Sequence, residues 1–142
     1  MKKRLLSLFS GCGGMDIGFE GGFLSPAATI NKNIHADWIA STIKNQVQLK
    51  ETIFETVFAN DINEYARIAW NHYFSKKRGK DINGTFRVNS IVDIVKAHQE
   101  GVEVVFPDNI AVVTGGFPCQ DFSVSGKRKG FNSHKDLSLI HI

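Results

Sequence analysis

The sequence predicts an α/β fold in which a parallel sheet carries helices on both faces, as in a doubly wound sheet. Short runs of apolar and β-branched residues alternate with segments whose apolar residues recur at helical spacing. Glycines or polar residues separate these segments. The chain has 142 residues, of which 42% are hydrophobic and 22% charged. It is therefore long enough for one ordinary globular domain and too short for two.

The first predicted unit is a strand, a tight turn and a helix. Residues 4–9 form a short apolar run that leads directly into three glycines within residues 11–14. Residues 15–20 are amphipathic and predict a helix. Residues 23–50 follow as a connecting insertion, in which we expect a helix from about residue 36 to residue 48.

The second unit is a strand followed by a helix. Residues 52–60 are rich in β-branched and aromatic residues and run into Asp61, while residues 64–74 have apolar residues at helical spacing. Residues 76–84 are basic and contain glycine, which predicts a surface loop. Such a charge run is more often a solvated face than a binding site.

Two further strands complete the predicted sheet. Residues 85–88 and 110–114 are the candidates, and a short helix over residues 91–98 lies between them. Ser90 and Asp93 resemble a capping box at the start of this helix. The resulting order of strands and helices is typical of parallel α/β sheets.

Composition excludes several classes of protein. The formal charge is +3, with 17 Lys and Arg against 14 Asp and Glu, which permits nucleic acid as a partner without requiring it. No apolar run approaches the roughly 18 residues of a membrane span, and the apolar run near the start is too short for a secretion signal, so we expect a cytoplasmic protein. Two cysteines, Cys12 and Cys119, with no CxxC or nearby His pair indicate neither a disulfide framework nor a metal site.

Three segments with candidate chemistry follow predicted strands. Because ligands of such folds bind beyond the carboxyl ends of the strands, we expect these segments to form one site. The glycine turn at residues 9–14 could approach a nucleotide-like cofactor, although Asp16 stands where a dinucleotide motif has its third glycine and would repel a phosphate. A purely structural turn is the alternative.

The other two segments offer a carboxylate and a thiol. Asp61 lies 50 residues after Gly11 and could accept the hydroxyls of a ribose, or could instead cap the following helix. Cys119 stands in a loop stiffened by Pro118 and preceded by glycines, which suits a nucleophile, while a buried inert cysteine is the alternative.

Taken together, the segments LFSGCGGMDIGFE, FANDINEYA and GGFPCQDFSVSGKRKG resemble, in this order, the cytosine C5 DNA methyltransferase family. The resemblance spans residues 5–131, with the insertion as a gap. It implies a Rossmann-like methyltransferase domain, S-adenosyl-L-methionine as cofactor and double-stranded DNA with a flipped-out cytosine as substrate. A restriction-modification system with a cognate endonuclease is the implied setting.

The resemblance also assigns roles by position. Cofactor contacts fall on Phe9, Gly11, Cys12, Gly14, Asp61, Ile62, Ser90, Gly116 and Pro118. The family usually has an acid in the third cofactor loop, where this chain offers Asn89 and the hydroxyl of Ser90. Cys119 matches the nucleophile that adds to the cytosine ring. DNA contacts fall on Gln120, Ser123, Ser125, Lys127, Arg128 and Lys129.

Several elements of the family are not found in the sequence. They are the later Glu-Asn-Val and Gln-x-Arg-x-Arg segments and the region that reads the DNA sequence. We therefore expect residues 1–142 to be the amino-terminal part of a catalytic domain, with a non-native end at about 136–142, an open sheet edge and no turnover alone. A relative acting on transfer RNA and an inactive cofactor-binding remnant remain alternatives.

Overall fold

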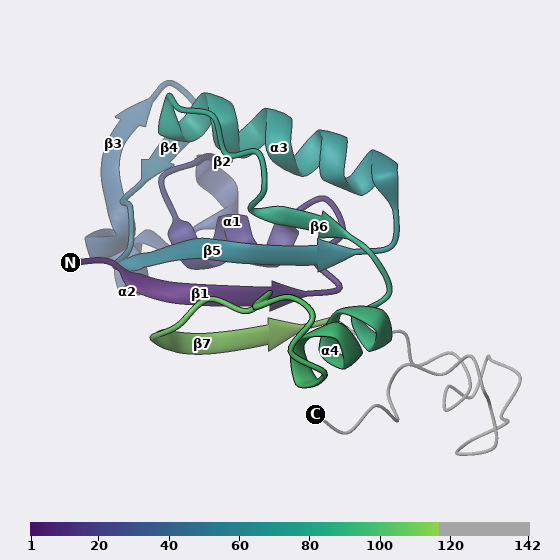
Figure 1. Cartoon of the computed structure of the whole chain (residues 1–142). Coiled ribbons are helices and arrows are strands. Elements are labelled where there is room, and N and C mark those ends of the chain that lie inside the picture. Colours follow the sequence, from purple (N-terminus) through teal and green to yellow (C-terminus); the bar gives the residue numbers. More distant parts are fainter. Residues whose placement is uncertain (117–142) are drawn as a thin grey trace, which may run out of the picture.

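The structure is a computed structural model that describes residues 1–116, and a parallel sheet of four strands lies at its centre (Figure 1). The strands are β1 (Lys3–Leu8), β5 (Phe54–Asp61), β6 (Phe86–Val88) and β7 (Ile110–Gly115), in the order β6-β5-β1-β7. The helices of this unit are α1 (Gly14–Glu20), α3 (Glu64–Arg78) and α4 (Ile91–Gln99). The predicted α/β fold with four parallel strands is confirmed for this part of the chain.

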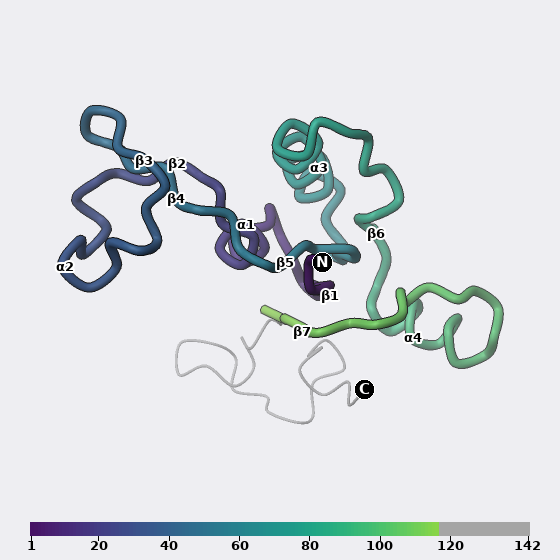
Figure 2. The backbone as a smooth tube through the Cα atoms, turned by 90° about the vertical axis from the view of Figure 1, so that its left-hand side faces the viewer, coloured from purple at the N-terminus to yellow at the C-terminus, as the bar shows by residue number. Residues whose placement is uncertain are grey.

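Helices cover both faces of the central sheet, with α1 and α3 on one side and α4 on the other (Figure 2). The core toward α3 consists of Ala59, Ala66, Trp70, Phe74, Ile82 and Phe86. The core toward α4 consists of Leu6, Leu8, Phe58, Ile91 and Ile94. Phe58 and Ala59 enter different clusters because successive side chains of a strand point to opposite faces. The helices on both faces make the sheet doubly wound, as predicted.

The predicted helix at residues 36–48 is wrong. The insertion instead forms an antiparallel sheet of β2 (Leu24–Pro26), β3 (Ile39–Ile43) and β4 (Gln46–Leu49), with the short helices η1 (Ala27–Thr29), α2 (Lys32–His35) and η2 (Ala36–Trp38) between β2 and β3. The β-branched residues of β3 favour a strand, and Lys44 turns the chain with a φ of +53°. Val47 of β4 is fully buried, so the hairpin gives this segment its buried face.

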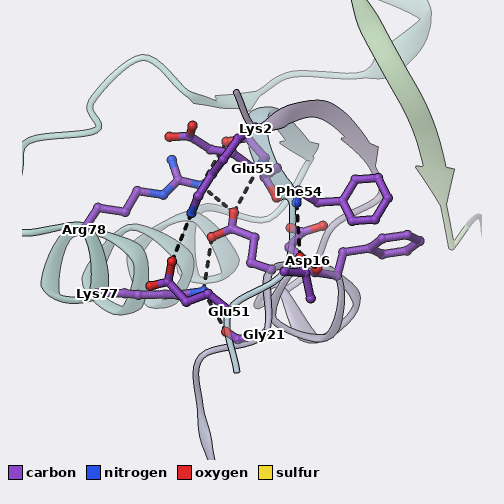
Figure 3. Close-up of polar contacts among 12 residues, drawn as sticks. Lys2, Asp16, Gly21, Glu51, Phe54, Glu55, Lys77 and Arg78 are labelled. Carbon is purple, nitrogen blue, oxygen red and sulfur yellow. Dashed lines mark hydrogen bonds and ion pairs between the residues drawn. The ribbon is translucent and has the colours of Figure 1, made fainter. Parts of the chain in front are cut away.

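The predicted surface loop at residues 76–84 is wrong at its beginning, because α3 continues to Arg78 and ends at Gly79 with a φ of 62°. Lys77 and Arg78 reach across to α1 (Figure 3). Their nitrogens lie 3.2 and 2.5 Å from the carboxylate oxygens of Glu20, and both side chains are 11% exposed. Because of these ion pairs, Lys77 and Arg78 pack at the end of α3 and are not part of a solvated loop.

Helix α4 begins after Ser90, as predicted, but the Ser90 side chain makes no capping hydrogen bond. The predicted capping box is therefore wrong. Asp93 is one methylene shorter than the glutamate of a standard box, and the helix start is held by its backbone, with the Ile94 N–H donating to the Ser90 carbonyl at 3.1 Å. Among residues 1–116, no helix is long and apolar enough to cross a membrane.

Candidate functional site

The carboxyl ends of the parallel strands meet at one edge of the central sheet, where their arrowheads point the same way (Figure 1). The glycine turn follows β1 here, and Asp61 ends β5. The Gly11 N–H donates to Asp61 Oδ2 at 3.0 Å, although the two residues are 50 positions apart in the sequence. The first two segments that the sequence analysis singled out therefore lie side by side.

The backbone of the turn needs glycine at two positions. Gly11 and Gly13 have φ angles of +52° and +87°, in the left-handed region that other residues rarely adopt. The hydroxyl of Ser10 donates to the Ser7 carbonyl at 3.0 Å and accepts the Asn60 N–H at 3.2 Å. The turn is thereby attached to β1 and to the end of β5.

One side of the glycine turn is open and the other is packed against protein. A Cβ added at Gly11 or Gly14 would meet no atom within 4 Å, and Cys12 between them is exposed. A Cβ at Gly13 would lie only 2.6 Å from Cδ1 of Trp70. A ligand can therefore approach the backbone closely from the open side, while α3 closes the other side.

Asp61 shares its carboxylate between two backbone groups. Oδ2 accepts the Gly11 N–H, and Oδ1 accepts the Asn63 N–H at 3.0 Å. Asn63 is the N-cap of α3, because its side chain accepts the Tyr65 N–H, so the alternative that Asp61 caps this helix is wrong. Each carboxylate oxygen keeps further acceptor capacity, and the adjacent Ile62 is 68% exposed. The end of β5 thus presents hydrogen-bond acceptors beside an apolar surface.

Asn60 joins the turn to the loop that follows β6. Its side chain is buried, and Nδ2 donates to the carbonyls of Arg87 and Asn89 at 3.0 and 2.9 Å. Its own carbonyl accepts the Ser10 N–H at 2.8 Å. Ser90, the predicted third-loop residue, is half-buried directly after these contacts. This role of Asn60 is not predictable from the sequence, because no spacing marks a side-chain amide that donates to carbonyls distant in the chain.

The end of β7 also reaches the turn. The Gly116 N–H donates to the Leu8 carbonyl at 3.4 Å, and a Cβ at Gly116 would lie 3.8 Å from the carbonyl oxygen of Phe9, itself at a φ of +53°. The remaining predicted residues lie outside the described part of the chain: Pro118, Cys119, Gln120, Ser123, Ser125, Lys127, Arg128 and Lys129. Within residues 1–116, no group of His, Cys, Asp or Glu side chains could hold a metal ion.

Asp16 is enclosed by protein rather than presented on the open side of the turn. It is fully buried, and its Oδ2 accepts the Trp70 Nε1–H at 2.7 Å. Burial raises the pKa of this carboxyl group, and the nearby Ser7 hydroxyl and the Trp70 N–H oppose the rise. The sequence places this carboxylate near a ligand, but the fold uses it inside the core.

Comparison with known proteins identifies the family. The C-5 cytosine-specific DNA methylase family matches residues 3–141 of the chain. The chain belongs to this family. This methylase-family chain is 29% identical over 127 residues to the Type II methyltransferase M.BsuRI of Bacillus subtilis and 33% identical over 145 residues to M.BspRI of Lysinibacillus sphaericus. A 35-residue stretch is 49% identical to the Type II methyltransferase M.CviJI of Paramecium bursaria Chlorella virus IL3A.

The alignments with the two bacterial enzymes cover 89% and 99% of this methylase-family chain, but 25% and 28% of those proteins. The chain therefore spans about a quarter of the length of these relatives. Membership confirms the predicted resemblance and the predicted fold class, an incomplete Rossmann-like methyltransferase domain. C-5 cytosine DNA methylases act on DNA and generally use S-adenosylmethionine.

Proposed function

We propose that the chain is the cofactor-binding and nucleophile-bearing part of a DNA (cytosine-5-)-methyltransferase that uses S-adenosylmethionine. The main support for the proposal is the 3.0 Å hydrogen bond from the Gly11 N–H to Asp61. It brings together, at the carboxyl ends of the parallel strands, the first two segments that resemble cofactor segments of the family. The glycine turn supplies close backbone approach, and Asp61 supplies the acceptors for ribose hydroxyls.

The residues present fit this cofactor. The open space outside Gly11 and Gly14 leaves room for a ligand against the turn, as a close backbone contact requires. Both oxygens of Asp61 can accept hydrogen bonds beyond those they already accept. The exposed Ile62 offers an apolar surface for the adenine. Phe9, Cys12, Ser90, Gly116 and Pro118 complete the proposed cofactor site.

The proposed chemistry places the nucleophile just after β7. When bound, S-adenosylmethionine supplies an electrophilic methyl group. The Cys119 thiolate forms a bond to C6 of the flipped-out cytosine, which makes C5 nucleophilic toward that methyl group. Once C5 carries the methyl group and has given its proton to a base, the bond between C6 and sulfur breaks and the thiolate leaves with the electron pair. Gly116, the last described residue, is hydrogen-bonded to the end of β1 and precedes Cys119 by three positions in the sequence.

DNA binding is assigned to the segment that follows the nucleophile. Its Lys and Arg side chains suit contacts to phosphates, and Gln120, Ser123 and Ser125 suit contacts around the displaced base. A restriction-modification system is the proposed setting, because the similar proteins are Type II methyltransferases. A cytoplasmic location belongs to the same proposal, since the substrate is DNA.

Calorimetry with S-adenosylmethionine tests the cofactor half of this proposal. We expect saturable binding to the purified chain, and a loss of about tenfold or more in affinity for Asp61→Ala, since hydrogen bonds to a charged group contribute about 1.5–3 kcal/mol. Asp108→Ala is the matched control, because Asp108 is exposed and precedes β7 at the other end of the sheet. A folded chain without binding, or equal affinity in Asp61→Ala, would contradict the proposal.

A further inference from the structure

Trp70 and Asp16 form a buried pair directly beneath the glycine turn. Both residues are fully buried, and the indole Nε1–H donates to Asp16 Oδ2 at 2.7 Å. Trp70 lies near the middle of α3, whereas Asp16 lies in the first turn of α1, 54 positions earlier in the sequence. The hydrogen bond therefore joins the helix that the turn opens to the helix that packs behind it.

The indole ring of Trp70 also packs against the glycine turn, at Gly13. An added Cβ at Gly13 would lie 2.6 Å from Trp70 Cδ1 and 3.0 Å from Nε1, so the backbone of the turn rests against the ring. The N–H of Gly13 in turn donates to the Ser10 carbonyl at 2.9 Å. A shift of Trp70 toward or away from α1 would therefore move the turn with it.

The buried pair of Trp70 and Asp16 is less favourable for the stability of the core than apolar side chains would be. Among the described residues, Asp16 Oδ1 accepts no hydrogen bond of ordinary length. Burial raises the pKa of this carboxyl group, and the nearby Ser7 hydroxyl and the Trp70 N–H offset only part of that rise. A buried carboxylate without full hydrogen bonding destabilises a fold relative to a well-packed apolar group. Packing alone therefore does not explain an acid at this position, whereas its hydrogen bond to Trp70 attaches the first turn of α1 to α3.

We propose that Trp70 and Asp16 are positioning residues for the cofactor, because their hydrogen bond sets the height of the glycine turn above α3. This inference rests on the proposed function, since it assigns the turn to S-adenosylmethionine. Both side chains are fully buried and so are closed off from a ligand at the open side of the turn. They act through Gly13 and the first turn of α1.

Paired variants separate this role from a contribution to stability. Trp70→Phe keeps an aromatic ring against Gly13 and removes the N–H donor, but it leaves the Asp16 carboxylate buried without its hydrogen bond. The double variant Trp70→Phe/Asp16→Leu removes both polar partners and should recover most of the stability, because replacing both by apolar groups is nearly neutral. Asp16→Asn keeps an oxygen that can accept the Trp70 N–H.

Ile82→Ala is the control for general loosening of the core. Ile82 is 5% exposed and belongs to the same core cluster as Trp70, but it lies in the segment before β6. This variant creates a cavity without altering the hydrogen bond beneath the turn. It therefore shows how much cofactor affinity follows from lost stability alone.

For each variant of the 142-residue chain, the measurements are the affinity for S-adenosylmethionine and the free energy of unfolding. We expect the double variant to bind about tenfold more weakly despite its recovered stability, a typical effect of losing a support for a preorganised site. Asp16→Asn and Ile82→Ala should bind within about twofold of the unsubstituted chain, as expected where the support is kept. The Gly13 amide should also exchange its hydrogen faster in the double variant than in Ile82→Ala.

The outcomes are distinguishable. If the double variant is stable and binds as tightly as the unsubstituted chain, the pair has only a structural role and the inference is wrong. If Ile82→Ala loses as much affinity as the double variant, the effect belongs to stability and the inference is again wrong. A folded, unsubstituted chain that does not bind would overturn the proposed function itself, and this inference with it.

Discussion

Replacing Glu20 with Gln is expected to destabilise the chain strongly at neutral pH. The Glu20 side chain is 2% exposed, and its carboxylate accepts the Thr56 N–H at 2.9 Å and pairs with Lys77 and Arg78 (Figure 3). The amide of Gln can still accept from Thr56, but it leaves two largely buried cations without their counter-charge. Breaking one side of a buried ion pair costs about 3–5 kcal/mol.

The loss of stability caused by Glu20→Gln should depend on pH, and it should be greater at neutral than at acid pH. Burial is the largest influence on Glu20 and opposes its ionisation, but the Thr56 N–H and the charges of Arg78 and Lys77 together outweigh it and lower the pKa. A lowered pKa stabilises the fold at pH values above the ordinary value of 4.5, and this contribution is lost as the pH falls through the folded-state pKa. The difference between the unsubstituted chain and Glu20→Gln should therefore be largest near pH 7 and narrow below pH 4.5.

Urea unfolding followed by circular dichroism measures this difference. With a slope of about 1.5 kcal/mol per molar urea, a loss of about 3 kcal/mol lowers the midpoint by about 2 M. Glu64→Gln is the control, because Glu64 forms an exposed ion pair with Arg67 on the surface of α3 and should leave the midpoint nearly unchanged. Equal midpoints for Glu20→Gln and the unsubstituted chain at pH 7 would refute the reasoning.

Two further predictions concern the turn and the nucleophile. Gly13→Ala should cost about 2–5 kcal/mol of unfolding free energy, the sum of a left-handed backbone and a clash with Trp70, whereas Gly11→Ala should cost only the backbone part of about 1–2 kcal/mol. Equal losses in denaturant unfolding would contradict the clash. No turnover is expected of residues 1–142 alone, but a single addition of Cys119 to the base can be trapped. With S-adenosylmethionine and a DNA duplex containing 5-fluorocytosine, we expect a covalent adduct that withstands denaturing electrophoresis and that Cys119→Ser does not form. An adduct with the equivalent RNA would instead favour the transfer RNA relative, and no adduct with either would favour an inactive remnant.

Local sequence was sufficient for the elements of the central sheet. The middle of each of the strands β1, β5 and β7 is mostly apolar or β-branched, because strands covered on both faces need apolar residues at most inward positions. The failures lie where partners distant in sequence decide the outcome. Lys77 and Arg78 look like a solvated loop until Glu20 is placed opposite them. Residues 36–48 of the insertion predict a helix by themselves, but they form strands that gain their pairing from each other and from β2.

The sequence by itself determined the family, the residues of the turn and the order in which the strands and helices of the central unit follow one another, because these depend on local patterns and short motifs. It could not determine which buried groups hold the site together. The contact of Asp61 with Gly11, the bonds of Asn60 to the third loop and the Trp70–Asp16 pair each join residues more than 25 positions apart. Only folding brings such residues within hydrogen-bond distance, since a hydrogen bond depends on positions to within a fraction of an ångström and on direction. The tertiary structure therefore decided that Asp16 lies inside the core and that Asp61 lies at the open edge.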